Sequence, residues 1–539
     1  MGFDFLDWGF PKSGTDWKSI NGKPYITVSS KGRSNGLSTK INDGADFGPD
    51  TTLKATSPSQ TGPPYTQTSG IGEAITYGNA NNKKIYLMNG AYNWNDELQN
   101  YLLANGTMII EGESKKGVQI NLLNNHWFSD AGNSEFSTNN TQFYYVSLKN
   151  VTFNGLGNST YPYSRFIFTL TQRSEFENID FNATPNITSF SGSMQFYLVD
   201  FGSLLNNVVT HTLTKDIRLF LNGSTGLING IHYESSYTYG NSITNIENIY
   251  SEINIFLGGG NINAKNLYSY SGVQIGNGSD MSGLPDIENI NVDGLIGRFY
   301  ITPGYNGTSP THNFNISNVI TEGESSINNS LTDPVYVNLE NIMVQSIYFQ
   351  PGSPYPFIIN IHNYIGLPTT LANSSHFAWL LTANITNLPV YIDIDGTFIN
   401  NIFDNYAISN YTATYVGRIK VKGVNLGSGN SLWSGAGVPI NIESIMDVHI
   451  LGLIEGLIPT TPAIPASGTA QQNMYPFPVN VYLYGGTVTE IQITKNGTAY
   501  TVFSNASGLA LSGQVYKLNP SDSITITYTT APTWNWLSD

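Results

Sequence analysis

The chain has 539 residues, of which 11% are charged and 12% aromatic, and it carries a formal net charge of -15 with no cysteine. Nucleic acid and anionic membranes need clusters of Lys and Arg, so this charge balance argues against both partners. The lack of cysteine excludes disulfides, thiolate metal sites and a Cys nucleophile. With 40% hydrophobic residues and 54 Gly, the composition is that of a folded, turn-rich β protein.

The first part of the chain, residues 1–40, is rich in aromatic residues and Gly and lacks a basic region followed by an apolar run. It therefore does not have the pattern of an export signal. From its position, we interpret this part as an N-terminal segment that anchors the protein in a particle. No stretch of the chain approaches the roughly 18 apolar residues of a spanning helix, so we expect no membrane insertion.

Residues 41–121 are predicted to be the opening, or capping, part of the next region. An acidic Gly-containing turn at 43–48 and the motif Asp50-Thr51-Thr52 precede a helical stretch at 71–75 and strands at 84–88 and 108–113. This order resembles the opening of the pectate-lyase-like right-handed parallel β-helix superfamily, in the branch of phage tailspikes and polygalacturonase relatives. The resemblance covers residues 41–455 and implies that fold and a place on a virion or outside the cell. Pro49 stands where that pattern has a second acidic residue.

The strongest internal signal is a recurring tetrad, apolar-x-Asn-apolar. Its Asn residues are Asn150, Asn178, Asn207, Asn248, Asn266, Asn289, Asn318, Asn341, Asn360 and Asn387. The two apolar residues cannot both face inward on a straight strand, because side chains alternate, so we expect a bend at each Asn. The recurrence predicts a solenoid that ends by about residue 455, with the Asn side chains stacked as a hydrogen-bonded ladder.

The end of the chain reads as a separate module. Residues 456–476 have the Pro/Thr-rich composition of a linker, and residues 477–539 alternate at period two between turns, which predicts a compact antiparallel β-sandwich. This module is similar to the short C-terminal β modules on structural proteins of archaeal viruses. The predicted fold class is therefore all-β: a right-handed parallel β-helix at 41–455 with a small C-terminal antiparallel β-sandwich.

A β-helix that cleaves polysaccharides needs carboxylates that converge in one groove, about 5 Å or about 6.5 to 9.5 Å apart. The candidate catalytic residues are Asp393, Asp395, Asp286, Glu288 and Asp293, and Glu175, Glu177 and Asp180 form a further acidic group. The Asn-x-Asp, Asp-Asp, Gly-His-Gly and Arg-x-Lys motifs of polygalacturonase-like enzymes do not occur together. The seven His residues show no metal-ligand spacing, so we expect no metal and no cofactor.

Aromatic residues in Gly- and Ser-rich surroundings are candidates for contacts with sugars, because a Tyr or Trp ring offers an apolar face and a polar tip. The glycan-binding candidates are Tyr233, Tyr237, Tyr239 and Trp433. The same rings would also suit packing between loops or between subunits. The candidate glycosylation sequons begin at Asn105, Asn150, Asn158, Asn182, Asn186, Asn222, Asn306, Asn315, Asn384, Asn410 and Asn496.

Together these features lead us to expect a virion surface attachment spike or tail-fibre protein, located on the virion or outside the cell. We expect a homo-oligomer, with a trimer as the leading form, that contacts other virion proteins and a host-surface glycan or protein. Two alternatives stay open at this point. One is a structural capsid or surface-layer component without a ligand, and the other is a polysaccharide-degrading enzyme, a glycosidase or a lyase, on the same fold.

Overall fold

The computed structural model describes residues 24–31, 45–51, 66–101, 106–123, 128–130, 143–157, 166–188, 197–202, 209–225, 229–234, 242–276, 288–303, 312–328, 334–350, 355–366, 377–380, 385–398, 403–406, 413–425, 433–434, 449–450, 461–474, 478–495, 497–519 and 521–538. The chain divides into two compact units. One unit comprises Met1–Val424 and Ser431–His449, and the other comprises Asn425–Asn430 and Ile450–Asp539.

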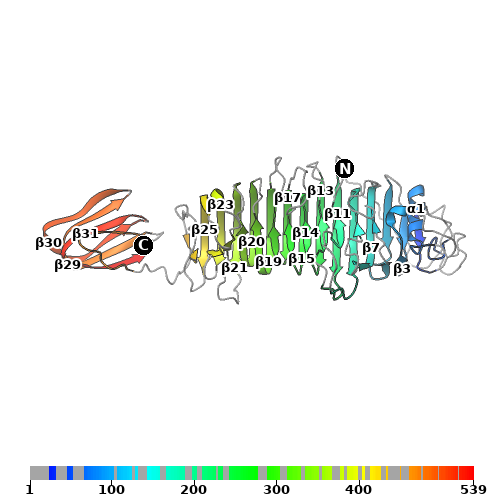
Figure 1. Cartoon of the computed structure of the whole chain (residues 1–539), viewed down its shortest axis with the longest axis horizontal. Helices are drawn as coiled ribbons and strands as arrows, with labels where there is room; N and C mark the ends of the chain where they lie inside the picture. The colour runs from blue at the N-terminus through cyan, green and yellow to red at the C-terminus, as the bar shows by residue number, and fades with distance from the viewer. Residues whose placement is uncertain are drawn as a thin grey trace. The chain divides into compact units, whose positions relative to one another are not determined.

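The first unit is built from one 27-stranded sheet. Its strands are β1 (Tyr25–Val28), β2 (Lys84–Leu87), β3 (Gly90–Trp94), β4 (Thr107–Gly112), β5 (Val118–Leu122), β6 (Phe128–Ser129), β7 (Phe143–Leu156), β8 (Phe166–Ile167), β9 (Thr171–Ala183), β10 (Val199–Phe201), β11 (His211–Phe220), β12 (Ile231–Tyr233), β13 (Ile243–Ser251), β14 (Ile255–Leu257), β15 (Gly260–Ser269), β16 (Val273–Ile275), β17 (Glu288–Ile296), β18 (Phe299–Ile301), β19 (His312–Asn328), β20 (Val335–Gln350), β21 (Phe357–Gly366), β22 (Phe377–Leu380), β23 (Ile385–Phe398), β24 (Phe403–Tyr406), β25 (Ala413–Asn425), β26 (Trp433–Ser434) and β27 (His449–Ile450). Figure 1 shows these strands stacked side by side from β3 to β25.

The strands pair in parallel, and most pair with the strand two places along the chain, as in β9–β11–β13–β15 and β10–β12–β14–β16. Each turn of the chain therefore contributes a long and a short strand to the stack. This pairing is that of a parallel β-helix, and it confirms the predicted fold class of the first unit. Because every coil buries its inner residues against the next coil, one continuous apolar core runs from Ile26 to Ile394.

The long strands bend at a corner where the backbone is left-handed. The corner residues and their φ angles are Asn150 (58°), Asn178 (55°), Asp216 (55°), Asn248 (56°), Asn266 (55°), Gly294 (84°), Asn318 (58°), Asn341 (56°) and Asn363 (54°). Asn, Asp and Gly are the residues that adopt this conformation most readily. The predicted bend is thus confirmed at six of the tetrad Asn residues: 150, 178, 248, 266, 318 and 341.

Three other tetrads were misread as corners. Asn289 and Asn360 lie within straight stretches of β17 and β21, and the corners of those coils are Gly294 and Asn363. Asn387 precedes Val390, the partner of Phe357, and so lies well before the corner level in β23. The tetrad at Asn207 falls outside the described residues. The left-handed residue of β11, the strand that follows it, is Asp216.

Counting from the corner residue orders the outward side chains. We call the side formed by residues five, three and one before the corner the pre-corner face, and the side formed by residues two after it the post-corner face. The row five before the corner includes Tyr145, Arg173, His211, Tyr336, Ile358 and Tyr391; the row three before it includes Glu175, Leu213, Asn245, Asn263, Asn291, Asn315, Asn338, Asn360 and Asp393. The row two after it includes Asp180, Arg218, Tyr250, Tyr268, Ile296, Ile320, Met343 and Ile365.

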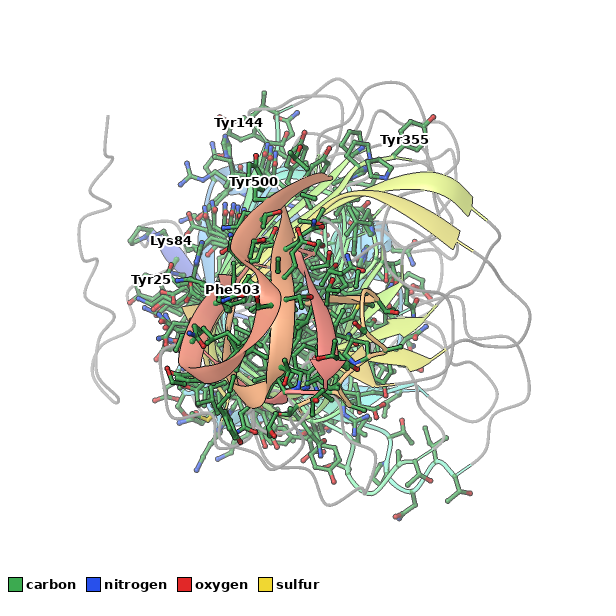
Figure 2. The ribbon with its side chains drawn as sticks, turned by 90° about the vertical axis from the view of Figure 1, so that its left-hand side faces the viewer. Tyr25, Lys84, Tyr144, Tyr355, Tyr500 and Phe503 are labelled. Atoms are coloured by element: carbon green, nitrogen blue, oxygen red, sulfur yellow. The ribbon has the colours of Figure 1, made fainter. Side chains whose placement is uncertain are left out.

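The N-terminal end of the stack differs in part from the prediction. The helical stretch is confirmed as α1 (Ile71–Asn81), which ends at a left-handed Asn82 and lies at the end of the stack near β3, followed by the 3₁₀ helix η2 (Leu98–Tyr101). β1, however, lies within the segment assigned to anchoring. It pairs in parallel with β2, with Tyr25 opposite Lys84. Figure 2 shows these two side chains close together at the edge of the view. The β-helix therefore begins before residue 41.

The second unit is a five-stranded antiparallel sheet of β28 (Ala470–Gln472), β29 (Val479–Lys495), β30 (Thr498–Leu518), β31 (Ser523–Thr530) and β32 (Thr533–Ser538). Its strands enclose a core that includes Val481, Ile491, Trp534 and Trp536, which agrees with the predicted small β module. Within the described residues β30 pairs only with β29, and it carries Tyr500 and Phe503 (Figure 2).

The predicted linker is partly wrong, because residues 461–474 pack as part of the second unit. β28 pairs with β31 in the sheet. The indole nitrogen of Trp534 donates to the carbonyl of Pro462 at 2.7 Å, and the Tyr528 hydroxyl donates to the carbonyl of Pro465 at 2.7 Å. The carbonyls of these prolines thus accept hydrogen bonds within the folded unit, which the Pro/Thr-rich composition of the segment did not indicate.

Candidate functional site

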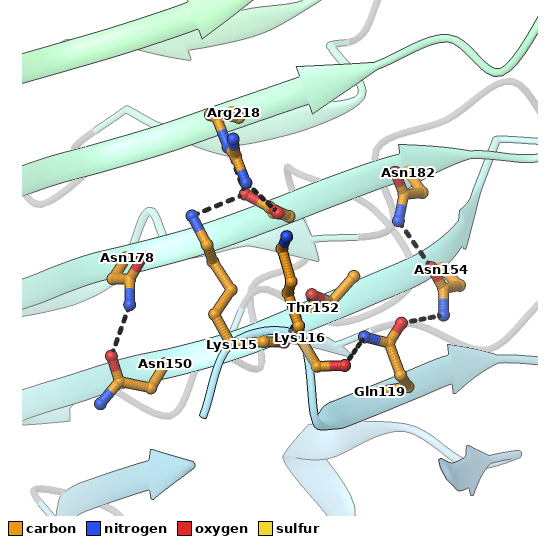
Figure 3. A network of polar contacts seen from close by, with 10 residues as sticks. Lys115, Lys116, Gln119, Asn150, Thr152, Asn154, Asn178, Asn182 and Arg218 are labelled. Atoms are coloured by element: carbon orange, nitrogen blue, oxygen red, sulfur yellow. Dashed lines mark hydrogen bonds and ion pairs between the residues drawn. The ribbon is translucent and has the colours of Figure 1, made fainter. Parts of the chain in front are cut away.

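The acidic group at Glu175, Glu177 and Asp180 does not form a converging catalytic pair. Asp180 is held by Arg218, whose two guanidinium nitrogens donate at 2.8 and 2.6 Å, and by Lys115 at 3.0 Å (Figure 3). Glu177 pairs with Lys149 at 2.8 Å. Each of these two carboxylates is paired with at least one cation of its own. Glu177 lies before the corner and Asp180 lies after it.

Asp293 also has a structural partner. Its carboxylate accepts hydrogen bonds from the Asn318 amide at 2.6 Å and from the Ser317 hydroxyl at 3.2 Å, which ties its coil to the next one. The register places Asp293 four coils from Asp395, or roughly 19 Å at the spacing of neighbouring strands. That distance is far beyond the 6.5 to 9.5 Å of a carboxylate pair in glycoside hydrolysis. Glu288 begins β17 with an undescribed side chain, and Asp286 lies outside the described residues.

Asp393 and Asp395 share the outer side of β23, as expected from their spacing. The carboxylate of Asp395 contacts Nδ1 of His362 at 2.8 Å and accepts the backbone N–H of Asn363 at 2.9 Å. Both Asp395 and His362 are about half exposed to solvent. Asp393 is half-buried and follows Asn360 in the row three before the corner. These two acids therefore remain a candidate pair at the C-terminal end of the pre-corner face.

A groove of about 350 Å³ opens on the pre-corner face where β9, β11 and β13 lie side by side. Its lining residues are Arg173, Ser174, Glu175, His211, Thr212, Leu213 and Asn245. The groove brings together a guanidinium, a carboxylate, an imidazole, an amide and an exposed Leu. This mixture of donors, acceptors and one apolar side chain suits a small polar ligand, and the volume is at the lower end of ordinary ligand sites.

The charged groups of the groove are held in place by contacts on the same face. Nη2 of Arg173 donates to Oε1 of Glu175 at 3.1 Å, and the guanidinium lies 5.5 Å from the centre of the Tyr145 ring. Burial and the nearby charge of Glu175 raise the pKa of Tyr145 to about 12, so its phenol stays protonated. The pairing with Glu175 offsets the charge of Arg173, which leaves the groove nearly neutral overall.

From Asn245 the groove continues into an exposed ladder of amides in the row three before the corner. Each Asn donates from its Nδ2 to the Oδ1 of the preceding one, through Asn245, Asn263, Asn291, Asn315, Asn338 and Asn360, at 3.2, 3.0, 2.9, 2.8 and 2.8 Å. An amide has two N–H donors and two acceptor sites, and the ladder uses one of each. In the inner rungs the ladder therefore leaves one donor and one acceptor of each amide for other contacts.

Two exposed tyrosines flank the C-terminal end of this ladder. Tyr336 and Tyr391 lie in the row five before the corner, with Ile358 between them in register. They are 36% and 45% exposed. Beside them run Asn338, Asn360 and Asp393 of the ladder row. Tyr336 and Tyr391 lie six and eight coils from Arg173, and their rings again stand next to amides and a carboxylate, as Tyr145 does at the groove.

A second group of ionisable residues lies on the short strands and is buried. Nδ1 of His232 contacts Oδ1 of Asp200 at 2.9 Å, and its Nε2 lies 3.6 Å from Oε2 of Glu234. The ring of Tyr197 stacks on His232 at 4.2 Å. All three ionisable side chains are less than a tenth exposed, so they do not present a surface to a polymer.

Of the aromatic glycan-binding candidates, Tyr233 was wrongly placed at the surface. Its side chain is fully buried and stacks on Phe201 at 5.2 Å, because position 233 faces inward on β12. Burial raises the pKa of its phenol. Trp433 begins β26, opposite Phe403, with an undescribed side chain. Tyr237 and Tyr239 lie outside the described residues.

Several sequon residues take part in the stack. Asn150, Asn182 and Asn315 belong to amide ladders, and Asn222 donates from Nδ2 to the carbonyl of Ala183 at 3.0 Å. Asn186 has a left-handed φ of 59° in a turn. The sequons at Asn105, Asn158, Asn306, Asn384, Asn410 and Asn496 lie outside the described residues.

Of the groove residues, only Glu175 is among the candidates taken from the sequence, although a signal for the others exists. Arg173 and His211 are each five residues before a corner, and Glu175, Leu213 and Asn245 are each three before one. Had Asp216 been recognised as a corner, counting back from it would have aligned these residues on one face.

Among the residues that the structure describes, no cluster of three or more His, Asp or Glu side chains could hold a metal ion, and no helix has the length and hydropathy to cross a membrane. No protein-family model matches the chain, and neither a curated protein nor a solved structure is significantly similar to it.

Proposed function

We propose that this chain is an attachment protein of a virion surface that binds a host-surface glycan along the pre-corner face, with the Arg173 groove as the main contact. It acts as a homo-oligomer whose copies present several such faces. The virion assignment rests on the resemblance of the opening and repeat to tailspikes. The glycan assignment rests on the groove.

The observation that carries the glycan assignment is the combination of the groove with the amide ladder. Sugar hydroxyls need both donors and acceptors, and Arg173, Glu175, His211 and Asn245 supply both within one groove. An extended chain of sugars leaving the groove meets the ladder, which offers the same chemistry at every coil. Because the chain carries a net charge of -15, we expect neutral glycans to bind more tightly than strongly anionic ones.

The test is to incubate the purified protein with a panel of neutral and anionic cell-surface polysaccharides, and to follow bound sugar and newly formed reducing ends together. Arg173→Ala should weaken binding about 10- to 150-fold, the effect of losing charge-assisted hydrogen bonds worth about 1.5 to 3 kcal/mol. Arg298→Ala is the matched control, because Arg298 is exposed but lies beyond the corner. Binding that is unchanged by Arg173→Ala, or absent for every glycan, would contradict the proposal.

The second candidate function is cleavage of the bound glycan, and the contact between Asp395 and His362 beside Asp393 is the observation in its favour. New reducing ends in the same assay would support it. The first substitutions would then be Asp393→Asn and Asp395→Asn, which should abolish the new ends and leave binding at Arg173 intact. Binding without new ends would retire both acids as catalytic candidates.

A further inference from the structure

An apolar stripe runs along the post-corner face over six successive coils. Its members are in register from strand to strand: Tyr250, Tyr268, Ile296, Ile320, Met343 and Ile365. Tyr268, Ile296, Ile320 and Ile365 are 38%, 50%, 49% and 38% exposed. Tyr250 and Met343, in the same row, are partly buried. Single exposed apolar residues are ordinary, whereas apolar residues aligned over successive coils form a candidate contact surface.

The two ends of the stripe and its edge along the corner are polar. In the same row, the stripe is preceded by Asp180 and Arg218, which form a bidentate ion pair, and is followed by Thr397. On one side it borders the corner residues, most of them Asn, whose amides bond to one another along the stack. An apolar centre with a polar rim is the usual arrangement of a protein interface.

We propose that this stripe is the surface through which copies of this chain pack side by side, stripe against stripe. Six rungs at the spacing of neighbouring strands, about 4.8 Å, give a straight row about 24 Å long. A partner that fits it must offer an apolar row of the same length and pitch. A second copy of the same β-helix carries such a row, and symmetric self-association is the commonest form of assembly.

The charge distribution also favours a second copy. Two copies of a chain with a net charge of -15 repel each other unless they meet on an uncharged surface, and none of the six stripe residues is charged. The row one before the corner, in contrast, alternates charges, with Lys149 on Glu177 at 2.8 Å and Lys215 on Glu247 at 3.8 Å. The amide ladder is uncharged as well, but its amides are solvated, so of these two uncharged rows the stripe is the one that gains free energy when a second copy covers it.

The size of the stripe argues for a partner as long as the stack. A row about 24 Å long and two strand positions wide covers roughly 200 Å², whereas a stable interface buries about 800 Å² per partner. The contact must therefore spread to neighbouring rows over the whole length of the stripe. A second stack of coils lying parallel to the first can make contacts of this extent, whereas a short peptide cannot.

The first experiment measures the oligomeric state of the full chain by light scattering during size-exclusion chromatography. The dissociation constant of the assembly should be at least 100-fold higher for the Ile296→Glu/Ile320→Glu variant than for the wild type. Val209→Glu is the matched control, because Val209 is 37% exposed and precedes the corner. A wild-type monomer at micromolar concentration, or a double variant that stays assembled, would overturn the inference. Unchanged circular dichroism shows that the variant is folded.

The second experiment uses the absence of cysteine in the chain. Ile296→Cys lies near the middle of the stripe, so a short bismaleimide should join two copies whether they run parallel or antiparallel. Val209→Cys should give no such product. Failure of Ile296→Cys to cross-link in an assembled protein, or equal cross-linking at both positions, would place the interface elsewhere.

This inference deepens the proposed function, because it rests on the homo-oligomer that the function requires. The two fail separately. If the wild type assembles but the stripe variants change nothing, only the interface is wrong. If the protein assembles through the stripe and binds no glycan, the interface stands and the attachment function does not.

Discussion

The two rows on either side of the corner share a backbone and differ in what they leave exposed. Three residues before the corner the coils place Asn245, Asn263 and their successors, whose amides bond to one another along the stack. Two residues after it they place Tyr268, Ile296 and their successors, which have no polar group to offer or only a phenol. The amide row is a solvated surface that can hydrogen-bond to water or a ligand. The apolar row lowers the free energy of the protein only when another surface covers it.

This difference teaches that position relative to the corner, and not the type of strand, decides the role of a residue in this β-helix. The inner positions on both sides are apolar and buried, as Ile246 and Ile249 illustrate around Asn248. What varies is the outer position. The pre-corner row therefore suits ligand binding, and the post-corner row suits assembly.

The largest expected effect separates the inner position from the outer one next to it. Leu295 is fully buried and Ile296 is half exposed. Leu295→Ala should lower the free energy of unfolding by about 2 to 5 kcal/mol through lost burial and a cavity. Ile296→Ala should change the free energy of unfolding of the monomer by less than about 1 kcal/mol. Urea unfolding at low protein concentration checks this, and equal losses would contradict the assignment of inside and outside.

A smaller effect is expected at the corner itself. Asn341 has a φ of 56°; its amide donates to Oδ1 of Asn318 at 3.1 Å and accepts from Nδ2 of Asn363 at 2.8 Å. Asn341→Ala should lower the free energy of unfolding by about 1.5 to 3 kcal/mol, because Ala resists the left-handed backbone and cannot replace the bonds. Asn341→Gly keeps the backbone and should cost about 1 kcal/mol. If thermal unfolding shows the Asn341→Gly variant to be less stable than the Asn341→Ala variant, the stability of the corner does not depend on the left-handed conformation.

The amide ladder should contribute less per rung, since it is exposed. Asn338 donates to Asn315 and accepts from Asn360, both at 2.8 Å, in an extended strand. Asn338→Ala should lower the free energy of unfolding by about 0.5 to 1.5 kcal/mol. Hydrogen exchange should show the loss confined to the neighbouring coils, as in other stacked repeats. A loss spread evenly over the unit would count against rung-by-rung stabilisation.

The smallest effect is expected in the row of alternating charges. Lys215 and Glu247 are 3.8 Å apart and both side chains are about 40% exposed. A double-mutant cycle with Lys215→Ala and Glu247→Ala should give a coupling of about 0.2 to 1 kcal/mol that declines with salt. A larger coupling that salt does not change would mean that this row is covered in the folded protein.

The repeat in the sequence was enough to predict the parallel β-helix and most of its corners. It was not enough to place every coil, because the same tetrad arises in a straight strand when an outward Asn stands between inward residues. Asn360 between Ile359 and Ile361 is such a case. Asp216 and Gly294 were missed because Asp and Gly also adopt the left-handed backbone without matching the tetrad.

Elsewhere the composition misled. The prolines at 462 and 465 suggested a linker, yet their carbonyls accept hydrogen bonds from Trp534 and Tyr528. The candidate site was predicted less well than the fold. Asp393 and Asp395 share a face as expected, but Tyr233 faces the core, and the groove residues emerge only when β9, β11 and β13 are aligned by their corners. Such an alignment needs long-range pairing that short motifs do not contain.

The division of labour between the two faces is tested most directly by measuring glycan binding and oligomeric state on the same two variants. Binding is followed with a short oligosaccharide, so that the affinity of one groove is measured. Arg173→Ala should lose binding and remain assembled, and Ile296→Glu/Ile320→Glu should dissociate and keep the affinity of each groove. If either variant loses both properties while folded, or neither loses its own, the two faces do not have the separate roles assigned to them.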